Sequence, residues 1–171
     1  MGIEIERKYL IRKPDTALLD ARASETWDIT QTYLLSEPDC TERVRLVRGA
    51  DGERYFHTVK RRRSVLSCEE MEEEITEAAY ETFLLRRDPA RCTIEKRRWR
   101  IPYEKHLLEI DVYPFWRDAA VLEIELADES DIAACPDWVE VLADVTADVR
   151  FKNVSIAKQV PAIGEFLQRN S

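Results

Sequence analysis

The amino-acid sequence predicts a mainly β protein of the α+β class, in which a closed sheet surrounds a charged lumen. The first observation is an alternation at the N-terminus, where Glu4, Glu6 and Lys8 alternate with residues that include Ile3 and Ile5. Side chains at i and i+2 of a strand point to one face, so this strand has a charged face opposite an apolar one. The second observation is that the alternation recurs in run after run along the chain. Closure of the sheet around the charged faces explains this repetition.

Strand signals dominate the chain, and turn signals such as those at 36–39 and 49–52 separate the runs. We expect strands over residues 2–12, 29–35, 41–48, 53–61, 69–76, 92–103, 106–114 and 120–127. Helical spacing is rarer, and Thr76 is the expected N-cap of one helix. We expect helices over residues 14–22, 77–87, 136–145 and 153–169, the last interrupted at Pro161. We expect all these elements to form a single domain over residues 1–171.

Composition argues against several classes of function. The net charge of −8 argues against general nucleic-acid binding, although 26 Lys and Arg residues permit local basic sites. No apolar run approaches the roughly 20 residues of a membrane helix, and no signal-peptide pattern is visible. The 4 cysteines are scattered without a CxxC pair, which indicates free thiols rather than a zinc site. We therefore expect a cytoplasmic monomer or homodimer with no nucleic-acid or membrane partner.

Charges at i, i+2 spacing occur in most of the predicted strands. They are Arg43 and Arg45, Glu70, Glu72 and Glu74, Lys96, Arg98 and Arg100, Glu109 and Asp111, and Glu123 and Glu125, with Lys60 ending another run. A single pair of this kind is ordinarily a solvated strand face, but several of these strands have a strongly apolar opposite face that must be buried. Acidic strands matched by basic strands indicate a lumen that binds a polyanion through Arg and Lys and a metal through carboxylates. Hard oxygen ligands favour Mg²⁺ or Mn²⁺, which predicts metal-assisted phosphoryl transfer.

The order of these runs resembles a known family. The segment Glu4-Ile5-Glu6-Arg7-Lys8 matches the ExExK signature of the CYTH superfamily, the triphosphate tunnel metalloenzymes. The resemblance continues through the charged runs and closes with 145–153, which is similar to the family's C-terminal motif. It implies a closed antiparallel β-barrel tunnel of about eight strands with a few surface helices. It also implies a small-molecule triphosphate substrate and Mg²⁺ or Mn²⁺ as the cofactor, and the chain resembles short bacterial inorganic tripolyphosphatases.

The resemblance implies roles for the residues of the lumen. The expected metal ligands are Glu4, Glu6, Asp111, Glu123 and Glu125. The expected triphosphate clamp is Arg43, Arg45, Lys60, Lys96 and Arg98. The expected catalytic residues are Lys8, Tyr33, Glu70 and Glu72. In this scheme the two glutamates position the attacking water or a second metal. Lys8, paired with Tyr33, helps to activate water and needs a lowered pKa, which a crowded cationic tunnel would supply.

The expected activity is metal-dependent hydrolysis of inorganic tripolyphosphate to diphosphate and phosphate. Alternatives in the same tunnel are a thiamine triphosphatase or nucleoside triphosphatase, a class IV adenylate cyclase, and a non-catalytic polyphosphate-binding module. Arg61–Arg63 is either a solvated loop or a basic rim that attracts anions. Phe151 stands where the family motif often has Tyr, and we expect the missing hydroxyl to affect the ordering of the C-terminal segment.

Overall fold

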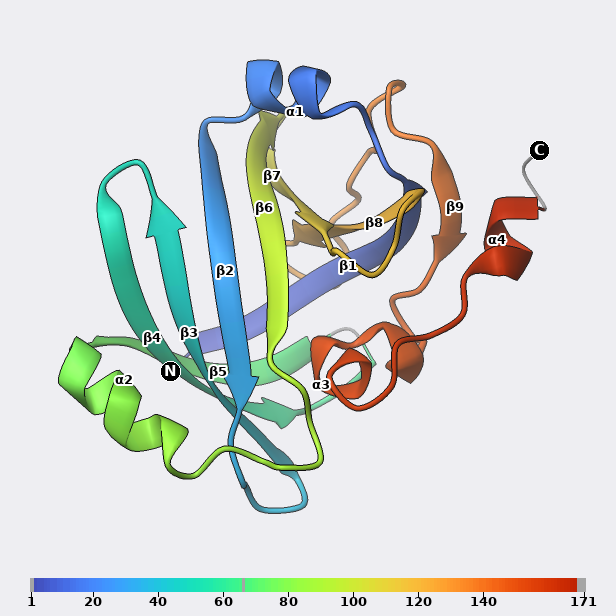
Figure 1. Cartoon of the computed structure of the whole chain (residues 1–171). Coiled ribbons are helices and arrows are strands. Elements are labelled where there is room, and N and C mark those ends of the chain that lie inside the picture. Colours follow the sequence, from blue (N-terminus) through green and yellow to red (C-terminus); the bar gives the residue numbers. More distant parts are fainter. Residues whose placement is uncertain (1, 66, 169–171) are drawn as a thin grey trace.

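The computed structural model, described for residues 2–65 and 67–168, contains one antiparallel sheet that closes on itself (Figure 1). The described strands are β1 (Gly2–Arg12), β2 (Glu25–Tyr33), β3 (Cys40–Gly49), β4 (Gly52–Arg62), β5 (Ser67–Ile75), β6 (Ile94–Tyr103), β7 (His106–Val112), β8 (Ala119–Glu125) and β9 (Val141–Asp144). Their order is β5-β4-β3-β2-β6-β7-β8-β1-β9, and β5 also pairs with the start of β1. That last pairing closes a barrel of eight strands, so the predicted closed antiparallel barrel is confirmed.

β9 corrects the sequence prediction, because residues 136–145 were expected to form a helix. The strand Val141–Asp144 instead pairs with β1 through Tyr9, Leu10 and Ile11. β5 pairs with β1 only up to Ile5, so the following part of that edge is left without a partner. The unpaired backbone groups of an edge strand favour another strand over a helix, and apolar spacing in a short segment fits both.

The helices are short; α1 and α2 pack on the outside of the barrel, whereas η1 and α3 lie at one end of the lumen and contribute to the lining of its cavity (Figure 1). They are α1 (Thr16–Arg22), α2 (Glu77–Leu84), the 3₁₀ turn η1 (Val149–Phe151), α3 (Asn153–Ile156) and α4 (Gly164–Gln168). The expected cap of α2 is present, since the Thr76 side chain accepts a hydrogen bond from the backbone N–H of Ala79 at 3.2 Å. The helix expected over 153–169 with an interruption at Pro161 is present as two short helices, and the interruption between α3 and α4 is longer than expected, covering 157–163. Its expected last residue, 169, lies outside the described residues.

The hydrophobic core lies mainly on the outer face of the barrel rather than in the lumen. One cluster joins the outward side chains of β1, β6, β7 and β8 to α1, with Ile110, Leu122 and Ile124 fully buried. A second cluster packs β3 and Leu34, the residue after β2, against Tyr80 of α2. Because these clusters stabilise the barrel from outside, the inward face is free to carry charges.

A third cluster bounds the charged part of the lumen. Along β1 the inward row Glu4, Glu6 and Lys8 continues with Leu10, which is fully buried in this cluster together with Phe151. Phe151 is 1 % exposed, so its ring holds η1 against the barrel by packing. The effect of the missing hydroxyl on the order of the C-terminal segment stays a prediction.

Among the described residues, no helix has the length and apolar character needed to cross a membrane.

Stability should depend on the outer core. We expect Leu122→Ala to lower the free energy of unfolding by about 3 kcal/mol, because Leu122 is fully buried and its loss leaves a cavity. The matched control is Ile3→Ala, in an exposed side chain of the barrel, for which we expect a change within about 0.5 kcal/mol. Urea unfolding followed by circular dichroism measures both, and equal losses would contradict the assignment of the core.

Candidate functional site

The lumen holds a cavity of about 1130 Å³ with a strongly charged lining. The predicted site residues that line it are Glu4, Glu6, Lys8, Tyr33, Arg43, Arg45, Lys60, Glu70, Glu72, Arg98, Glu123 and Glu125. Lys96 and Asp111 lie behind this surface and are 5 % and 0 % exposed. All fourteen predicted side chains therefore lie at the lumen, in two layers. Glu74 is not part of the lining and pairs with Arg54 at 2.6 Å.

Strand register brings opposite charges together across the sheet. Lys8 on β1 lies opposite Glu123 on β8, and Arg98 on β6 lies opposite Asp111 on β7. Directly opposite residues in an antiparallel pair have neighbouring Cβ atoms, so the ion pairs follow from the register. Two pairs depart from this rule, because Glu6 lies opposite Glu125 and Glu109 lies opposite Glu123, the latter with Arg98 in contact with both carboxylates. Two like charges in this position are unfavourable unless a cation lies between them.

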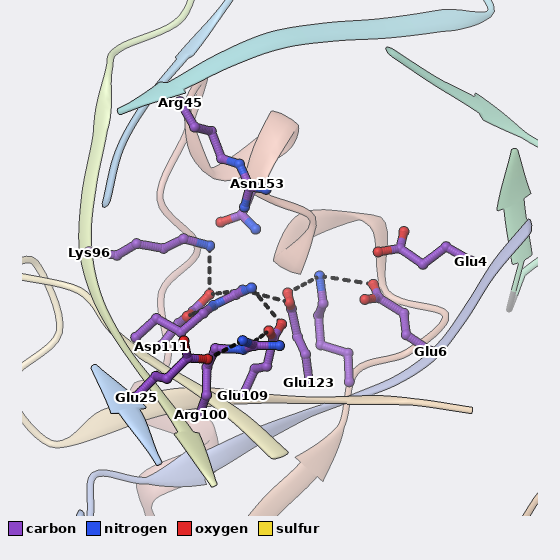
Figure 2. A network of polar contacts seen from close by, with 12 residues as sticks. Glu4, Glu6, Glu25, Arg45, Lys96, Arg100, Glu109, Asp111, Glu123 and Asn153 are labelled. Carbon is purple, nitrogen blue, oxygen red and sulfur yellow. Dashed lines mark hydrogen bonds and ion pairs between the residues drawn. The ribbon is translucent and has the colours of Figure 1, made fainter. Parts of the chain in front are cut away.

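Asp111 anchors the deep layer of the site (Figure 2). Its Oδ2 accepts hydrogen bonds from Lys96 Nζ at 2.6 Å and Arg98 Nη2 at 2.7 Å. Its Oδ1 accepts a third from Arg98 Nε at 2.6 Å. Burial raises the pKa of Asp111, but Arg98 and then Lys96 outweigh burial and lower it. Because both carboxylate oxygens are occupied by cations, the geometry favours a role in positioning Lys96 and Arg98 over the expected role as metal ligand.

A chain of alternating charges continues from Asp111 toward the cavity (Figure 2). Arg98 Nη2 donates to Glu123 at 2.9 Å, and Lys8 Nζ lies 3.0 Å from Glu123 and 3.6 Å from Glu6. Burial raises the pKa of Glu123, but Lys8 and Arg98 hold it well below its ordinary value. Burial raises the pKa of Glu6, and the nearby Glu123 raises it further. Glu6, the last carboxylate in this series of ion pairs, is therefore the one whose negative charge the neighbouring cations neutralise least.

Two expectations for Lys8 need correction. Burial lowers its pKa, but Glu123 and Glu6 outweigh burial and raise the pKa above its ordinary value. The predicted lowering failed because the neighbours of Lys8 are carboxylates rather than the cations that a crowded basic tunnel would supply. Nor do the described residues include a contact between Lys8 and Tyr33, whose hydroxyl accepts a hydrogen bond from Gln31 Nε2 at 2.8 Å.

Arg43 and Arg45 carry positive charge that the protein compensates only in part. Arg45 Nη2 donates to Glu72 at 2.7 Å, and Arg43 Nη1 reaches only the amide oxygen of Gln31 at 3.5 Å. The Nε atoms of both guanidinium groups are buried without a hydrogen-bond partner among the described residues. Burial and the neighbouring Arg43 lower the pKa of Arg45. Arg43 and Arg45 therefore present buried hydrogen-bond donors to an acceptor on a ligand in the cavity.

Next to Arg43 and Arg45, on β4, Lys60 lies among two carboxylates from β1 and β5. Lys60 Nζ makes a short contact with Glu4 and lies 3.5 Å from Glu70. Burial raises the pKa of Glu4, but Lys60 outweighs burial and lowers it to about 2. Burial raises the pKa of Glu70, and Lys60 offsets this only in part. Glu72, in contrast, accepts hydrogen bonds from both Arg45 and Thr58 Oγ1, and its pKa is lowered.

The carboxylates at the cavity surface suit a hard divalent cation, although they do not supply a complete coordination shell. Within the described residues, no three His, Cys, Asp or Glu side chains converge closely enough to hold a metal ion alone. Glu6 and Glu125 face each other across β1 and β8, and burial raises the pKa of both. Mg²⁺ ordinarily binds one or two protein carboxylates and completes its shell with water and phosphate oxygens. The donor set fits a cation of that kind.

The predicted site residues leave out several cations that line the cavity, namely Arg61–Arg63, Arg100 and Lys152. Lys152 follows η1 in an irregular segment, so no i, i+2 alternation marks it. Arg62 belongs to the run Arg61–Arg63, whose residues all line the cavity. Of the two interpretations left open for this run, the structure therefore supports the basic rim. Strand alternation would have identified Arg62, because it shares the inward face of β4 with Lys60.

Comparisons with known proteins agree with this architecture. The CYTH domain family matches residues 2–159. An inorganic triphosphatase of Acetivibrio thermocellus is 30% identical over 163 residues, which cover 92% of this chain and 95% of the relative. The solved structure of the inorganic triphosphatase NE1496 is 27% identical and has a TM-score of 0.56, covering 95% of this chain and 99% of that one. The PH1819 protein of Pyrococcus horikoshii shares the fold at a TM-score of 0.58 and 18% identity, over 74% of this chain and 80% of that one.

Stability should depend on pH through Lys96. Burial lowers the pKa of Lys96 to about 8, although Asp111 opposes this shift. An ordinary lysine keeps its proton to higher pH, so the unfolded chain binds more protons than the folded protein above pH 8. Folding stability attributable to Lys96 should therefore rise as the pH increases from about 8 to about 10.

The measurement is the free energy of unfolding of the wild type and of Lys96→Met across this range. We expect the wild type to gain about 2 kcal/mol relative to the variant, since the comparison cancels the other titrating groups. Parallel stability profiles for the two proteins would contradict the lowered pKa of Lys96.

Proposed function

The chain belongs to the CYTH domain family, and from this premise we propose that it hydrolyses inorganic tripolyphosphate to diphosphate and phosphate within the barrel. The observation that carries the proposal is the pair of buried, unpartnered Nε atoms of Arg43 and Arg45. A buried donor without an acceptor costs about 1–3 kcal/mol, and a phosphate oxygen would offset this cost. Two relatives bearing the name inorganic triphosphatase support the same substrate class.

The proposed clamp divides into two kinds of cation. Arg43 and Arg45 would bind phosphate oxygens directly, because guanidinium groups match them with parallel hydrogen bonds. Lys60 would also bind directly and would exchange its contact with Glu70 for one with substrate. Lys96 and Arg98 are held by Asp111, so they would act mainly as fixed positive charges beneath the substrate. Positive charge fixed before the reaction stabilises the charge that develops on the leaving diphosphate.

Glu70 is the proposed acceptor of the proton from the attacking water. Burial raises its pKa, which places the carboxyl closer to the working range of a general base than an ordinary glutamate. The water oxygen would bond to the terminal phosphorus as the bridging P–O bond breaks, and the electron pair of that bond would leave with diphosphate. Glu72 would hold Arg45 in place, as its contact with Arg45 indicates. Lys8 would remain protonated and would orient Glu6 and Glu123.

A divalent cation completes the proposed site, with Mg²⁺ and Mn²⁺ as the two candidates. Glu6 and Glu125 would hold it, because their carboxylates face each other and Lys8, 3.6 Å from Glu6, neutralises this pair only in part. Glu4 and Glu123 lie in the same cavity, but Lys60 and Lys8 neutralise them. When bound, the cation would polarise phosphate oxygens and allow carboxylates to lie close to an anionic substrate.

Phosphate release tests the proposed activity. We expect release from tripolyphosphate with Mg²⁺ or Mn²⁺ and none without metal, and weaker release from thiamine triphosphate and ATP. Arg45→Gln should raise KM or abolish turnover, because it removes a buried donor to phosphate. The control is Arg48→Gln on the same strand, an exposed residue that pairs with Glu53.

Several outcomes would contradict the proposal. Cyclic AMP formed from ATP would indicate an adenylate cyclase instead. Tight binding of tripolyphosphate with no turnover in either metal would indicate a binding module. Equal kinetics for Arg45→Gln and Arg48→Gln would contradict the proposed role of Arg45 in binding phosphate.

Metal binding should depend on Glu6. We expect Glu6→Gln to weaken Mn²⁺ binding at least about ten-fold in calorimetry without substrate, because it removes one of two facing carboxylates. Glu74→Gln is the control, since Glu74 pairs with Arg54 outside the cavity lining. Unchanged Mn²⁺ affinity in Glu6→Gln would place the cation elsewhere.

A further inference from the structure

The end of β2 beside the clamp arginines has an uncharged inward face, although β2 lies between two strands with basic inward faces. In the barrel β2 pairs with β3 on one side and with β6 on the other. Gln31 and Tyr33 share the inward face of β2 and are 0 % and 4 % exposed. The basic side chains on the two flanking strands are Arg43, Arg45, Lys96 and Arg98. Two buried polar side chains without charge therefore lie within a largely basic part of the lumen.

The side chain of Gln31 links Arg43 to Tyr33. Arg43 Nη1 donates to Gln31 Oε1 over a long contact of 3.5 Å, and Gln31 Nε2 donates to the Tyr33 hydroxyl oxygen at 2.8 Å. A guanidinium group has donors only, so the amide oxygen of Gln31 has to face Arg43 and the amide nitrogen has to face Tyr33. The orientation of this amide therefore follows from the chemistry of its neighbour.

This orientation also determines what the Tyr33 hydroxyl can do. Its oxygen accepts the hydrogen bond from Gln31, so its own hydrogen is free to point elsewhere. Tyr33 lines the cavity, and no group in the described part of the chain accepts that hydrogen. The hydroxyl therefore presents a hydrogen-bond donor to a ligand in the cavity.

Gln31 holds Arg43 without neutralising its charge. Arg45, on the same strand as Arg43, donates instead to the carboxylate of Glu72 at 2.7 Å. A carboxylate in the place of the Gln31 amide would likewise form an ion pair with Arg43 and would weaken its attraction for an anion. The neutral amide leaves the positive charge of Arg43 available to a ligand.

We propose that Gln31 is a positioning residue that orients Arg43 and the Tyr33 hydroxyl as two donors toward the phosphate groups of the substrate. The proposal rests on the proposed function, because it needs a triphosphate in the cavity to accept both hydrogen bonds. A single amide contacts both donors, so a phosphate that binds one of them meets the other already oriented. Gln31 acts through these two residues, since it is fully buried and does not belong to the cavity lining.

The test compares two substitutions of Gln31 by calorimetric titration with tripolyphosphate in EDTA, where the absence of metal prevents turnover. In Gln31→Glu the introduced carboxylate would neutralise Arg43 and would accept the hydrogen of the Tyr33 hydroxyl. We expect this variant to bind tripolyphosphate about ten-fold more weakly than the wild type, the usual effect of losing hydrogen bonds to a charged group. Gln31→Met keeps a similar length without charge, and we expect it to weaken binding only about three-fold.

A double-mutant cycle tests whether Gln31 acts through Tyr33. Tyr33→Phe should weaken tripolyphosphate binding about three-fold in the wild-type background, because it removes one neutral donor to phosphate. The same substitution should have less than about a 1.5-fold effect in the Gln31→Glu background, where the hydroxyl already donates to the introduced carboxylate. A purely structural role of Gln31 would leave the effect of Tyr33→Phe the same in both backgrounds.

Gln159→Glu is the matched control, because it makes the same change of an amide to a carboxylate at an exposed residue outside the cavity lining. We expect it to change the affinity for tripolyphosphate by less than about two-fold. Thermal melting of each variant checks that the fold is retained.

The remaining outcomes separate this proposal from the proposed function. Equal affinities of the wild type and Gln31→Glu would overturn the positioning role, and so would equal losses in Gln31→Glu and Gln31→Met. Failure of the wild type to bind tripolyphosphate would overturn the proposed function and would leave the two donors without their ligand. The ratios between the variants report only on Gln31.

Discussion

The buried carboxylate of Asp111 is the interaction on which the site depends. A charge that is fully removed from water is tolerated only when it is paired, and Asp111 is paired with both Lys96 and Arg98. Arg98 then holds Glu123, and Glu123 holds Lys8. Each ion pair orients the next, so a single buried acid fixes the floor of the cavity before any ligand arrives. Removal of one member would leave a buried charge uncompensated, which explains why the network has to be complete.

The apolar residues that stabilise the barrel lie mainly on its outer face, and the charged residues of the candidate site lie on its inner face. Apolar side chains such as Leu122 and Ile110 pack on the outer face of the strands. There α1 and the segment that follows β8 cover them. The inward face carries the charges, and Leu10 and Phe151 close off its apolar end. Since burial outside the barrel supplies most of the hydrophobic stabilisation, the lumen can tolerate crowded charges that would be unfavourable in an ordinary core.

The protein neutralises the charges in one part of the cavity more completely than those in another. The floor is neutralised by pairs such as Lys96 with Asp111, whereas Arg43 has only an amide partner. Among the described residues, Lys152 at the mouth has no ion pair. A polyanion would therefore bind most favourably next to Arg43, Arg45 and Lys152. Lys96 and Arg98 would supply fixed positive charge beneath it. Lys8 neutralises the facing pair Glu6 and Glu125 only in part, and a divalent cation fits there.

The sequence by itself determined the barrel and the residues that face its lumen, because alternation along a strand fixes which side chains share a face. It did not determine which charges neutralise one another, since pairing depends on register between strands distant in sequence. Lys8 was expected among cations, yet Glu123 lies opposite it on β8. The tertiary structure also decided that 141–144 joins β1 as a strand, because an open sheet edge outweighs a helical pattern in a short segment. Lys152 enters the cavity only because packing of Phe151 brings an irregular segment against the barrel, and no local pattern encodes that contact.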